Sequence, residues 1–364
     1  MNSVLSMLTW GTWDEADWVT LSAATTISVT SAGQLPTISQ RERSRRKLYK
    51  KGLKAPRNSQ LWFEELLERV EGTTFGRSKL RYYCNPINIS CKSSQAKETQ
   101  QQIIPWADLP RGIHPRDGKL PPERVTKKRQ QVDNLAVFLQ RILRPDDVVV
   151  EFCAGSGYVV LPLAFLFPQC KFILLDKKKP SLAIAKERIA AAQLTNVDVF
   201  CGFVDDYHSH FNVGVALHAC GEATDMVMRK CLAERAAYVL APCCVGKIKS
   251  SGLTYPRSVT LANEVSRVEY EVLAKAADFG HSINTEVAHA NINRRRRRCK
   301  TLLESDRNMY AEEAQYITFM FVMYPSTATP KNDVLVGIPR NPAVEATEQR
   351  NADVMFHLMC KSPL

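Results

Sequence analysis

The sequence predicts an α/β domain with a mostly parallel seven-stranded sheet, helices on both faces and an antiparallel C-terminal hairpin. Short, continuously apolar segments alternate with segments of helical length from residue 121 onward, a pattern typical of a buried parallel sheet covered by helices. The loop between the last two apolar segments, from Tyr324 to Asn332, is too short for a crossover helix, so these two strands should be antiparallel. A turn with two glycines, Gly155 and Gly157, follows the first strand and opens a helix, which favours a ligand site there.

The individual elements follow from the spacing of apolar residues. Helices are expected over residues 61–70, 121–144, 159–167, 180–193, 222–234, 260–279 and 304–315. Strands are expected over residues 147–153, 171–176, 197–201, 213–218, 237–241, 316–323 and 333–338. This order is the arrangement of the Rossmann-like class I methyltransferases, whereas a dinucleotide-binding Rossmann domain closes with a parallel strand.

The turn from Glu151 to Gly157 has the features of a cofactor-binding loop. Gly155 and Gly157 lack a Cβ, so a ligand can approach the backbone closely. Asp176 ends the second strand about 20 residues further on, where a carboxylate can accept hydrogen bonds from ribose hydroxyls. Val160 replaces the third glycine of a pyrophosphate-binding motif, and Glu151 would repel a pyrophosphate but suits a sulfonium and an amino group. The loop therefore favours S-adenosylmethionine over a nicotinamide dinucleotide.

The acidic pair Asp205 and Asp206 follows the third strand, where methyltransferases bind the adenine amino group. The predicted cofactor-binding residues are Glu151, Cys153, Gly155, Gly157, Asp176, Asp205 and Asp206. Two alternatives remain open. The turn could bind no ligand, or the domain could be a nicotinamide-dependent oxidoreductase.

Histidine and cysteine residues follow the fourth and fifth strands, at the edge of the sheet where ligands bind. His218 and Cys220 come after one strand, and Cys243 and Cys244 come after the next. We predict that these four residues line a catalytic pocket, in which His218 could act as a base for a hydroxyl nucleophile. A zinc site is the less favoured interpretation, because adjacent cysteines rarely reach one tetrahedral ion without strain, so no metal is predicted. Thiols that simply pack as small apolar groups are the third interpretation.

The chain of 364 residues has a net charge of +12, which favours a polyanionic partner such as RNA. Two basic segments could make this contact, one from Arg41 to Arg57 and the other from Arg294 to Arg298. Solvated loops or targeting signals are the alternative explanation of both segments. The 11 cysteines are odd in number, and no secretory signal or membrane-spanning segment is recognised. We therefore expect reduced thiols and a cytoplasmic, or else nuclear, location without membrane contact.

The composition also divides the chain into regions. Residues 1–104 are expected to form a poorly patterned basic N-terminal region and linker. Residues 105–340 should form the α/β domain, with a basic insertion at about 245–303, and residues 341–364 a C-terminal tail.

The stretch ALHACGEATDMVMRKCLAERAAYVLAPCCVGKI, which contains His218 and Cys243, resembles the C-terminal methyltransferase-like domain of the glutathione S-transferase C-terminal domain-containing protein family. The similarity extends from about Pro105 through EFCAGSGYV to the last two predicted strands. A related L-C-G-x-A-T-D segment occurs in a tRNA ribose 2′-O-methyltransferase family. The resemblance implies binding of S-adenosylmethionine, and the related tRNA enzymes make RNA a plausible substrate, with a tRNA-like molecule as one possibility.

The chain also departs from both families. Residues 1–100 are too weakly patterned to supply the glutathione-transferase-like helical domain, and the zinc-finger-like segments of the tRNA enzymes are not recognised. The alternative to an enzyme is a non-catalytic module with the methyltransferase fold that binds RNA or a protein partner.

Overall fold

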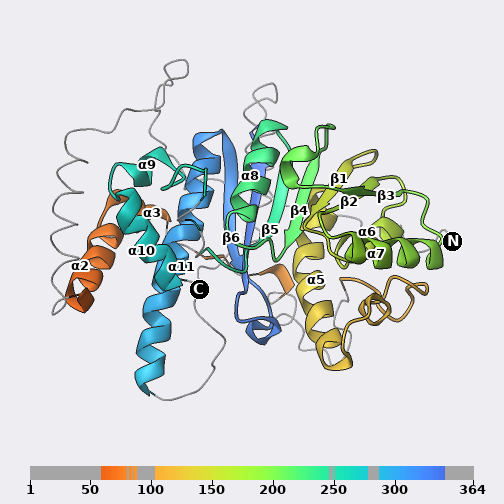
Figure 1. Ribbon diagram of the computed structural model, residues 1–364, viewed down its shortest axis with the longest axis horizontal. Helices are drawn as coiled ribbons and strands as arrows, with labels where there is room; N and C mark the ends of the chain where they lie inside the picture. The colour runs from red at the N-terminus through yellow and green to blue at the C-terminus, as the bar shows by residue number, and fades with distance from the viewer. Residues whose placement is uncertain are drawn as a thin grey trace, which may run out of the picture. The chain divides into compact units, whose positions relative to one another are not determined.

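The computed structural model describes residues 59–79, 82–83, 85–87, 103–245, 248, 251–277 and 287–340. Within these residues seven strands form one sheet in the order β3-β2-β1-β4-β5-β7-β6 (Figure 1). The strands are β1 Val148–Phe152, β2 Lys171–Asp176, β3 Val197–Cys201, β4 Val213–Leu217, β5 Ala237–Ala241, β6 Tyr316–Val322 and β7 Asp333–Pro339. β1 to β5 are parallel to one another, and β7 is antiparallel to both β5 and β6. The predicted fold class, including the antiparallel hairpin, is confirmed.

Helices connect and cover these strands. They are α2 Ser59–Glu71, α3 Thr74–Lys79, α5 Pro122–Ile142, α6 Val160–Leu166, α7 Lys179–Ala191, α8 Ala223–Ala233, α9 Val259–Ala262, α10 Arg267–Ala277 and α11 Val287–Glu313. Short 3-10 helices occur at η3 Pro115–Gly118, η4 Val204–Asp206 and η5 Ser326–Ala328. None of the helices in the described part of the chain combines the length and the apolarity that a membrane crossing requires.

Two hydrophobic cores lie on opposite faces of the sheet, because successive residues of a strand point to opposite sides. Val149 and Val215 face α5, α6 and α7, whereas Val150 and Ala216 face α8 and α11. A third core joins α2, α9, α10 and α11, and Figure 1 shows these helices together at the β6 edge of the sheet. The sheet is therefore buried on both faces, and its strand ends are left to form the site.

Two predicted helices differ from the observed ones. The expected helix over residues 260–279 is divided into α9 and α10, and the Ser258 side chain accepts a hydrogen bond from the Leu261 N–H at the start of α9. The expected helix over 304–315 is the C-terminal part of α11, which has 27 residues. The run from Arg294 to Arg298 lies inside this helix, where it hides the apolar period. Arginine nevertheless has a high helix propensity.

A chain of buried charges fixes α11 against α8 and β7. Arg307 contacts Asp225 of α8 at 2.8 Å and Glu304 at 2.9 Å. Lys300 contacts Glu304 at 3.3 Å and also pairs with Asp333, the first residue of β7. All five side chains are at most 2% exposed. Charges removed from water are tolerated only when they are paired.

We expect the variant Arg307→Leu to lower the free energy of unfolding by about 3–5 kcal/mol, because Asp225 and Glu304 would remain buried without their partner. Arg229→Leu is the matched control, since the ion pair of Arg229 with Asp205 is about half exposed. The free energy of unfolding of this variant should fall by only about 0–1 kcal/mol. Urea denaturation of both variants measures the difference. Equal losses would show that the buried ion pairs contribute no more to stability than a surface ion pair does.

Candidate active site

The strands β1 and β4 both end in an unusual backbone conformation. Cys153 after β1 has a φ of 56° and His218 after β4 a φ of 69°. Residues other than glycine rarely adopt this left-handed region, and such residues gather at functional sites. The His218 N–H donates to the Ala241 carbonyl at 3.0 Å, so the edge remains tied to β5.

The two glycines of the predicted cofactor loop differ in their surroundings. At Gly155, with φ +58°, an added Cβ would meet nothing within 4 Å, so the backbone faces open space. At Gly157, with φ +77°, an added Cβ would lie 2.9 Å from a methyl of Leu174. Gly157 is therefore required by packing, whereas Gly155 leaves room for a ligand.

The carboxylate of Asp176 holds this loop against the end of β2. One oxygen accepts the Gly155 N–H at 2.8 Å and the other accepts the Lys178 N–H at 2.8 Å. The side chain therefore lies beside the open space at Gly155, and its contact with ribose hydroxyls stays a prediction.

Glu151 is buried beneath the loop. Its Oε2 accepts the Val160 N–H at 3.0 Å at the start of α6. Burial raises the pKa of this carboxyl to about 7, against the lowering effect of the hydrogen bonds from Val160 and Val159. The side chain therefore supports the first turn of α6, and its contact with a ligand amino group stays a prediction.

The acidic pair after β3 is divided between two partners. Asp205 accepts a hydrogen bond from Arg229 at 2.8 Å, whereas Asp206 accepts the Phe203 N–H at 2.8 Å. The Phe203 side chain is 59% exposed, and Lys177 Nζ lies 5.5 Å from its ring centre. Phe203 was not among the predicted site residues, although a large apolar residue between a strand end and an acidic pair was a visible signal.

Polar side chains of α5 contact His218. Gln131 Oε1 lies 3.0 Å from His218 Nε2 and also accepts a hydrogen bond from Lys128 Nζ at 3.0 Å. The Gln131 amide donates to the Ala328 carbonyl at 2.9 Å, so this side chain is fixed. Gln131 and Lys128 were not among the predicted site residues, because they lie far from His218 along the chain and no local pattern connects them.

Positive charges surround His218. Burial, followed by the charges of Lys128, Arg124 and Lys331, lowers the pKa of His218 to about 4, so the imidazole is neutral at pH 7. Burial also lowers the pKa of Lys128 to about 8. Because α5 and the β6–β7 loop both contribute, the region around His218 is a basic part of the sheet edge.

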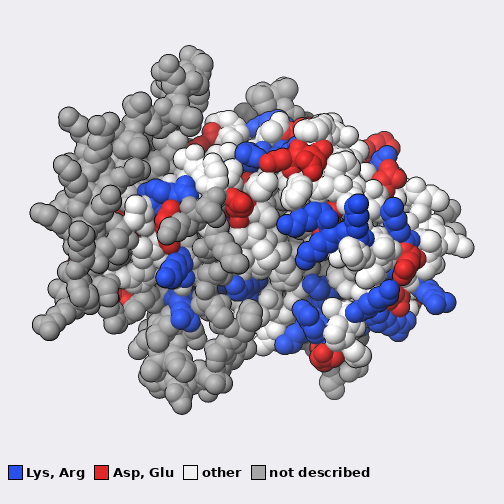
Figure 2. Space-filling model, viewed as in Figure 1, with Lys and Arg blue, Asp and Glu red and all other residues white. Residues whose placement is uncertain are grey.

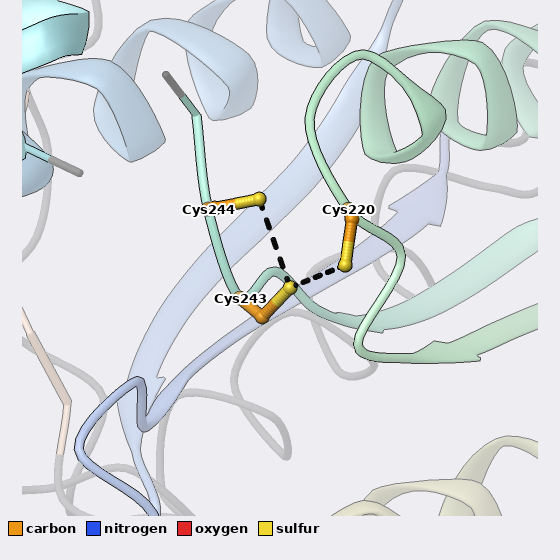
Figure 3. A group of neighbouring side chains, drawn as sticks. All are labelled: Cys220, Cys243 and Cys244. Atoms are coloured by element: carbon orange, nitrogen blue, oxygen red, sulfur yellow. Dashed lines mark hydrogen bonds between the residues drawn. The ribbon is translucent and has the colours of Figure 1, made fainter. Parts of the chain in front are cut away.

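The three cysteines after β4 and β5 form one cluster (Figure 3). The Sγ atoms of Cys220 and Cys243 are 2.9 Å apart, and those of Cys243 and Cys244 are 3.8 Å apart. The Gly221 N–H donates to Cys244 Sγ at 3.1 Å. Hydrogen bonds from Cys220 and Cys243 hold the pKa of Cys244 well below its usual range.

The cluster adjoins the cofactor loop through Cys153. Burial, and then the negative charges of Asp176 and Cys220, raise the pKa of the Cys153 thiol to about 11. The structure therefore brings His218, Cys220 and Cys243 to the same edge as the predicted cofactor loop. Their catalytic role stays a prediction.

Two members of the arginine run are engaged within the protein. Arg297 pairs with Asp333 at 2.6 Å and Arg298 with Glu71 of α2 at 2.6 Å. The side chains of Arg294 and Arg295 and the whole segment from Arg41 to Arg57 lie outside the described residues. Contact of either segment with RNA stays a prediction.

The raised pKa of Glu151 predicts a dependence of stability on pH. The ordinary pKa is 4.5 and the folded-state value about 7, so between these values the unfolded state loses a proton that the folded state keeps. Stability associated with Glu151 is therefore present below pH 4.5 and is lost as the pH rises toward 7.

We expect Glu151→Gln, whose amide oxygen can still accept the Val160 N–H, to remove this loss. Between pH 4.5 and 8, the free energy of unfolding of the variant should rise relative to that of the wild type by up to about 3 kcal/mol. Urea denaturation at several pH values provides the measurement. Parallel pH curves for the two proteins would contradict the buried position of the charge.

Comparisons with known proteins agree with this geometry. A family model for a methyltransferase domain matches residues 127–251. The glutathione S-transferase C-terminal domain-containing protein of Xenopus laevis is 37% identical over 237 residues, which cover 65% of this chain and 38% of that protein. The human protein of the same name is 35% identical over 240 residues, which cover 65% of this chain and 37% of its own length.

A shorter match is found to the ribosomal RNA small subunit methyltransferase G of a Thermoanaerobacter strain, at 24% identity over 91 residues, 23% of this chain and 38% of that protein. The chain spans less than half the length of these curated relatives. The resemblance predicted from the segments around His218 and Cys243 is confirmed. The methyltransferase domain of this chain is homologous to a domain of the glutathione S-transferase C-terminal domain-containing proteins.

Proposed function

We propose that this domain binds S-adenosylmethionine at Gly155 and transfers its methyl group to RNA. The observation that supports the cofactor most strongly is the open space over Gly155 beside the Asp176 carboxylate. A left-handed glycine that no side chain covers lets a ligand approach the backbone. The matching methyltransferase family model supports the same assignment.

The residues around the loop suit the parts of the cofactor. A carboxylate has about four lone-pair positions, and Asp176 uses two for backbone N–H groups, so two remain for the ribose hydroxyls. Asp206 suits the adenine amino group better than Asp205, because Arg229 engages both oxygens of Asp205 whereas the Phe203 N–H engages one oxygen of Asp206. The exposed ring of Phe203 offers an apolar surface for the adenine. Glu151 acts as a positioning residue through α6.

Methyl transfer is an in-line displacement at the sulfonium, so the chief requirement is correct placement of the nucleophile and the methyl group. Cys220 lies near Cys153 in the loop and adjoins Cys243, which in turn adjoins Cys244. Together with His218 these residues would flank the transferred group. The substrate would therefore enter over the ends of β4 and β5.

Charge around His218 supports an RNA substrate. Arg124, Lys128 and Lys331 all act on this residue, and Figure 2 shows Lys and Arg side chains gathered over α5, α6 and α7. Basic side chains at a site entrance neutralise phosphates. The short match to a ribosomal RNA methyltransferase is consistent with RNA. A non-catalytic module that binds RNA would share this surface, and only a transfer assay separates the two.

We expect Gly155→Arg to weaken binding of S-adenosylmethionine by at least about tenfold, or ~1.4 kcal/mol, because the new side chain would fill the open space. Gly155→Ala is the matched control. It introduces the same left-handed strain, about 1–2 kcal/mol of stability, but leaves most of the space open. Isothermal titration calorimetry gives the affinities and thermal denaturation gives the strain. Equal affinities of the Arg variant and the wild type would remove the cofactor assignment.

We expect transfer of labelled methyl groups from S-adenosylmethionine into fractionated cellular RNA, and its reduction in Arg124→Gln. Loss of one phosphate contact should also lower the slope of log affinity against log salt by about one. Arg144→Gln is the matched control, because Arg144 is exposed and precedes β1, at the end of the strands opposite the proposed site. Label that enters protein and not RNA would contradict the assignment of RNA as the substrate. Cofactor binding without any transfer would favour the non-catalytic module.

A further inference from the structure

We propose that Cys220, Cys243 and Cys244 bind a zinc ion through three thiolates and leave a fourth coordination position for an exchangeable ligand. The proposal is independent of the proposed methyl transfer, because it rests on the arrangement of the three sulfur atoms. Their Sγ atoms all lie within 4.8 Å of one another, and Figure 3 shows the three side chains converging from two segments.

The spacing of the sulfurs suits a tetrahedral ion. Two thiolates on zinc, with Zn–S bonds of about 2.3 Å, lie about 3.8 Å apart. Cys243 and Cys244 already have this separation, 3.8 Å. The difficulty that the sequence raised, that adjacent cysteines rarely reach one ion, therefore does not apply to this backbone. Cys220 lies 2.9 Å from Cys243 and must move outward by about 1 Å to complete the site.

The fold brings these residues together before any ion binds. β4 and β5 are paired in register from Val213 with Ala237 to Leu217 with Ala241. Cys220 follows the end of β4 by three residues and Cys243 follows the end of β5 by two. Because both strands are parallel and buried, the two segments leave the sheet side by side. Little ordering of the chain is then required for binding, which favours affinity.

Backbone groups around the sulfurs support a negatively charged cluster. The Gly221 N–H donates to Cys244 Sγ at 3.1 Å, just before the N-terminus of α8, which has 11 residues and a positive dipole end. Hydrogen bonds from backbone N–H groups to ligand atoms orient and stabilise metal sites. A cluster built only for apolar packing would not require a donor directed at one sulfur.

The fourth position is open to solvent, because Cys220 is exposed and Cys243 and Cys244 are half-buried. Structural zinc sites have four protein ligands, whereas three protein ligands with one open position are typical of catalytic sites. A zinc ion with an open position lowers the pKa of the water or thiol that it binds. The site takes a small oxygen or sulfur ligand at the edge where the cofactor loop ends.

The test uses the full chain, expressed with added zinc and purified without a metal-binding tag. We expect about one zinc per chain by elemental analysis, and an intense sulfur-to-cobalt charge-transfer band after replacement by Co²⁺. Cys220→Ser should lower the affinity for Co²⁺ by more than about tenfold. Because Cys220 is exposed, this variant should fold, and circular dichroism verifies it. Cys201→Ser, an exposed cysteine at the end of β3, is the matched control and should retain the metal.

A small thiol added to the Co²⁺ form examines the fourth position. A shift of the charge-transfer band supports an open site, and an unchanged band contradicts it. Equal metal content in Cys220→Ser and the wild type would overturn the site, as would absence of metal from both. A disulfide between Cys220 and Cys243 in the protein purified with zinc, detected as a loss of two titratable thiols, would also overturn it.

Discussion

The pairing of Asp225 with Arg307 is the contact on which the arrangement of the sheet edge depends. Both side chains are removed from water, and burial alone would raise the pKa of the carboxyl, but the charge of Arg307 keeps that pKa below its ordinary value. Tyr255 donates to the same carboxylate at 2.9 Å. Helix α8, helix α11 and the segment that carries Tyr255 are thus joined at one point. Neither helix can move away without leaving a buried charge unpaired.

This constraint acts on the site through the ends of the strands. α8 begins directly after the segment that carries His218 and Cys220, and Asp333 begins β7 beside the end of β5. The loops after β4 and β5 are therefore fixed on one side by the buried charges. On the other side, His218 after β4 lies 3.0 Å from Gln131 of α5. A site formed by loops gains from this support the accuracy that loops alone lack.

The strands could be predicted from the sequence almost to the residue, because a continuous apolar run of five to seven residues identifies a strand without tertiary information. The convergence of Cys220 with Cys243 could be predicted from the parallel strands alone, whereas cofactor binding by the glycine turn after β1 stays a prediction. Helix α11 was predicted only in part, because its arginines conceal the apolar period. Gln131 was missed for another reason, since its approach to His218 depends on a contact between distant segments that no local pattern records.

The arginine run within α11 also changes how the net charge of this protein should be understood. Arg297 pairs with Asp333 of β7, and Arg298 pairs with Glu71 of α2. Part of the positive charge therefore forms ion pairs within the protein. The Arg298 and Glu71 side chains are 35% and 27% exposed, and salt screens such contacts over about 8–10 Å. Rising ionic strength would therefore weaken the contact of helix α2 with α11. A binding assay alone would attribute this salt dependence to the loss of a partner.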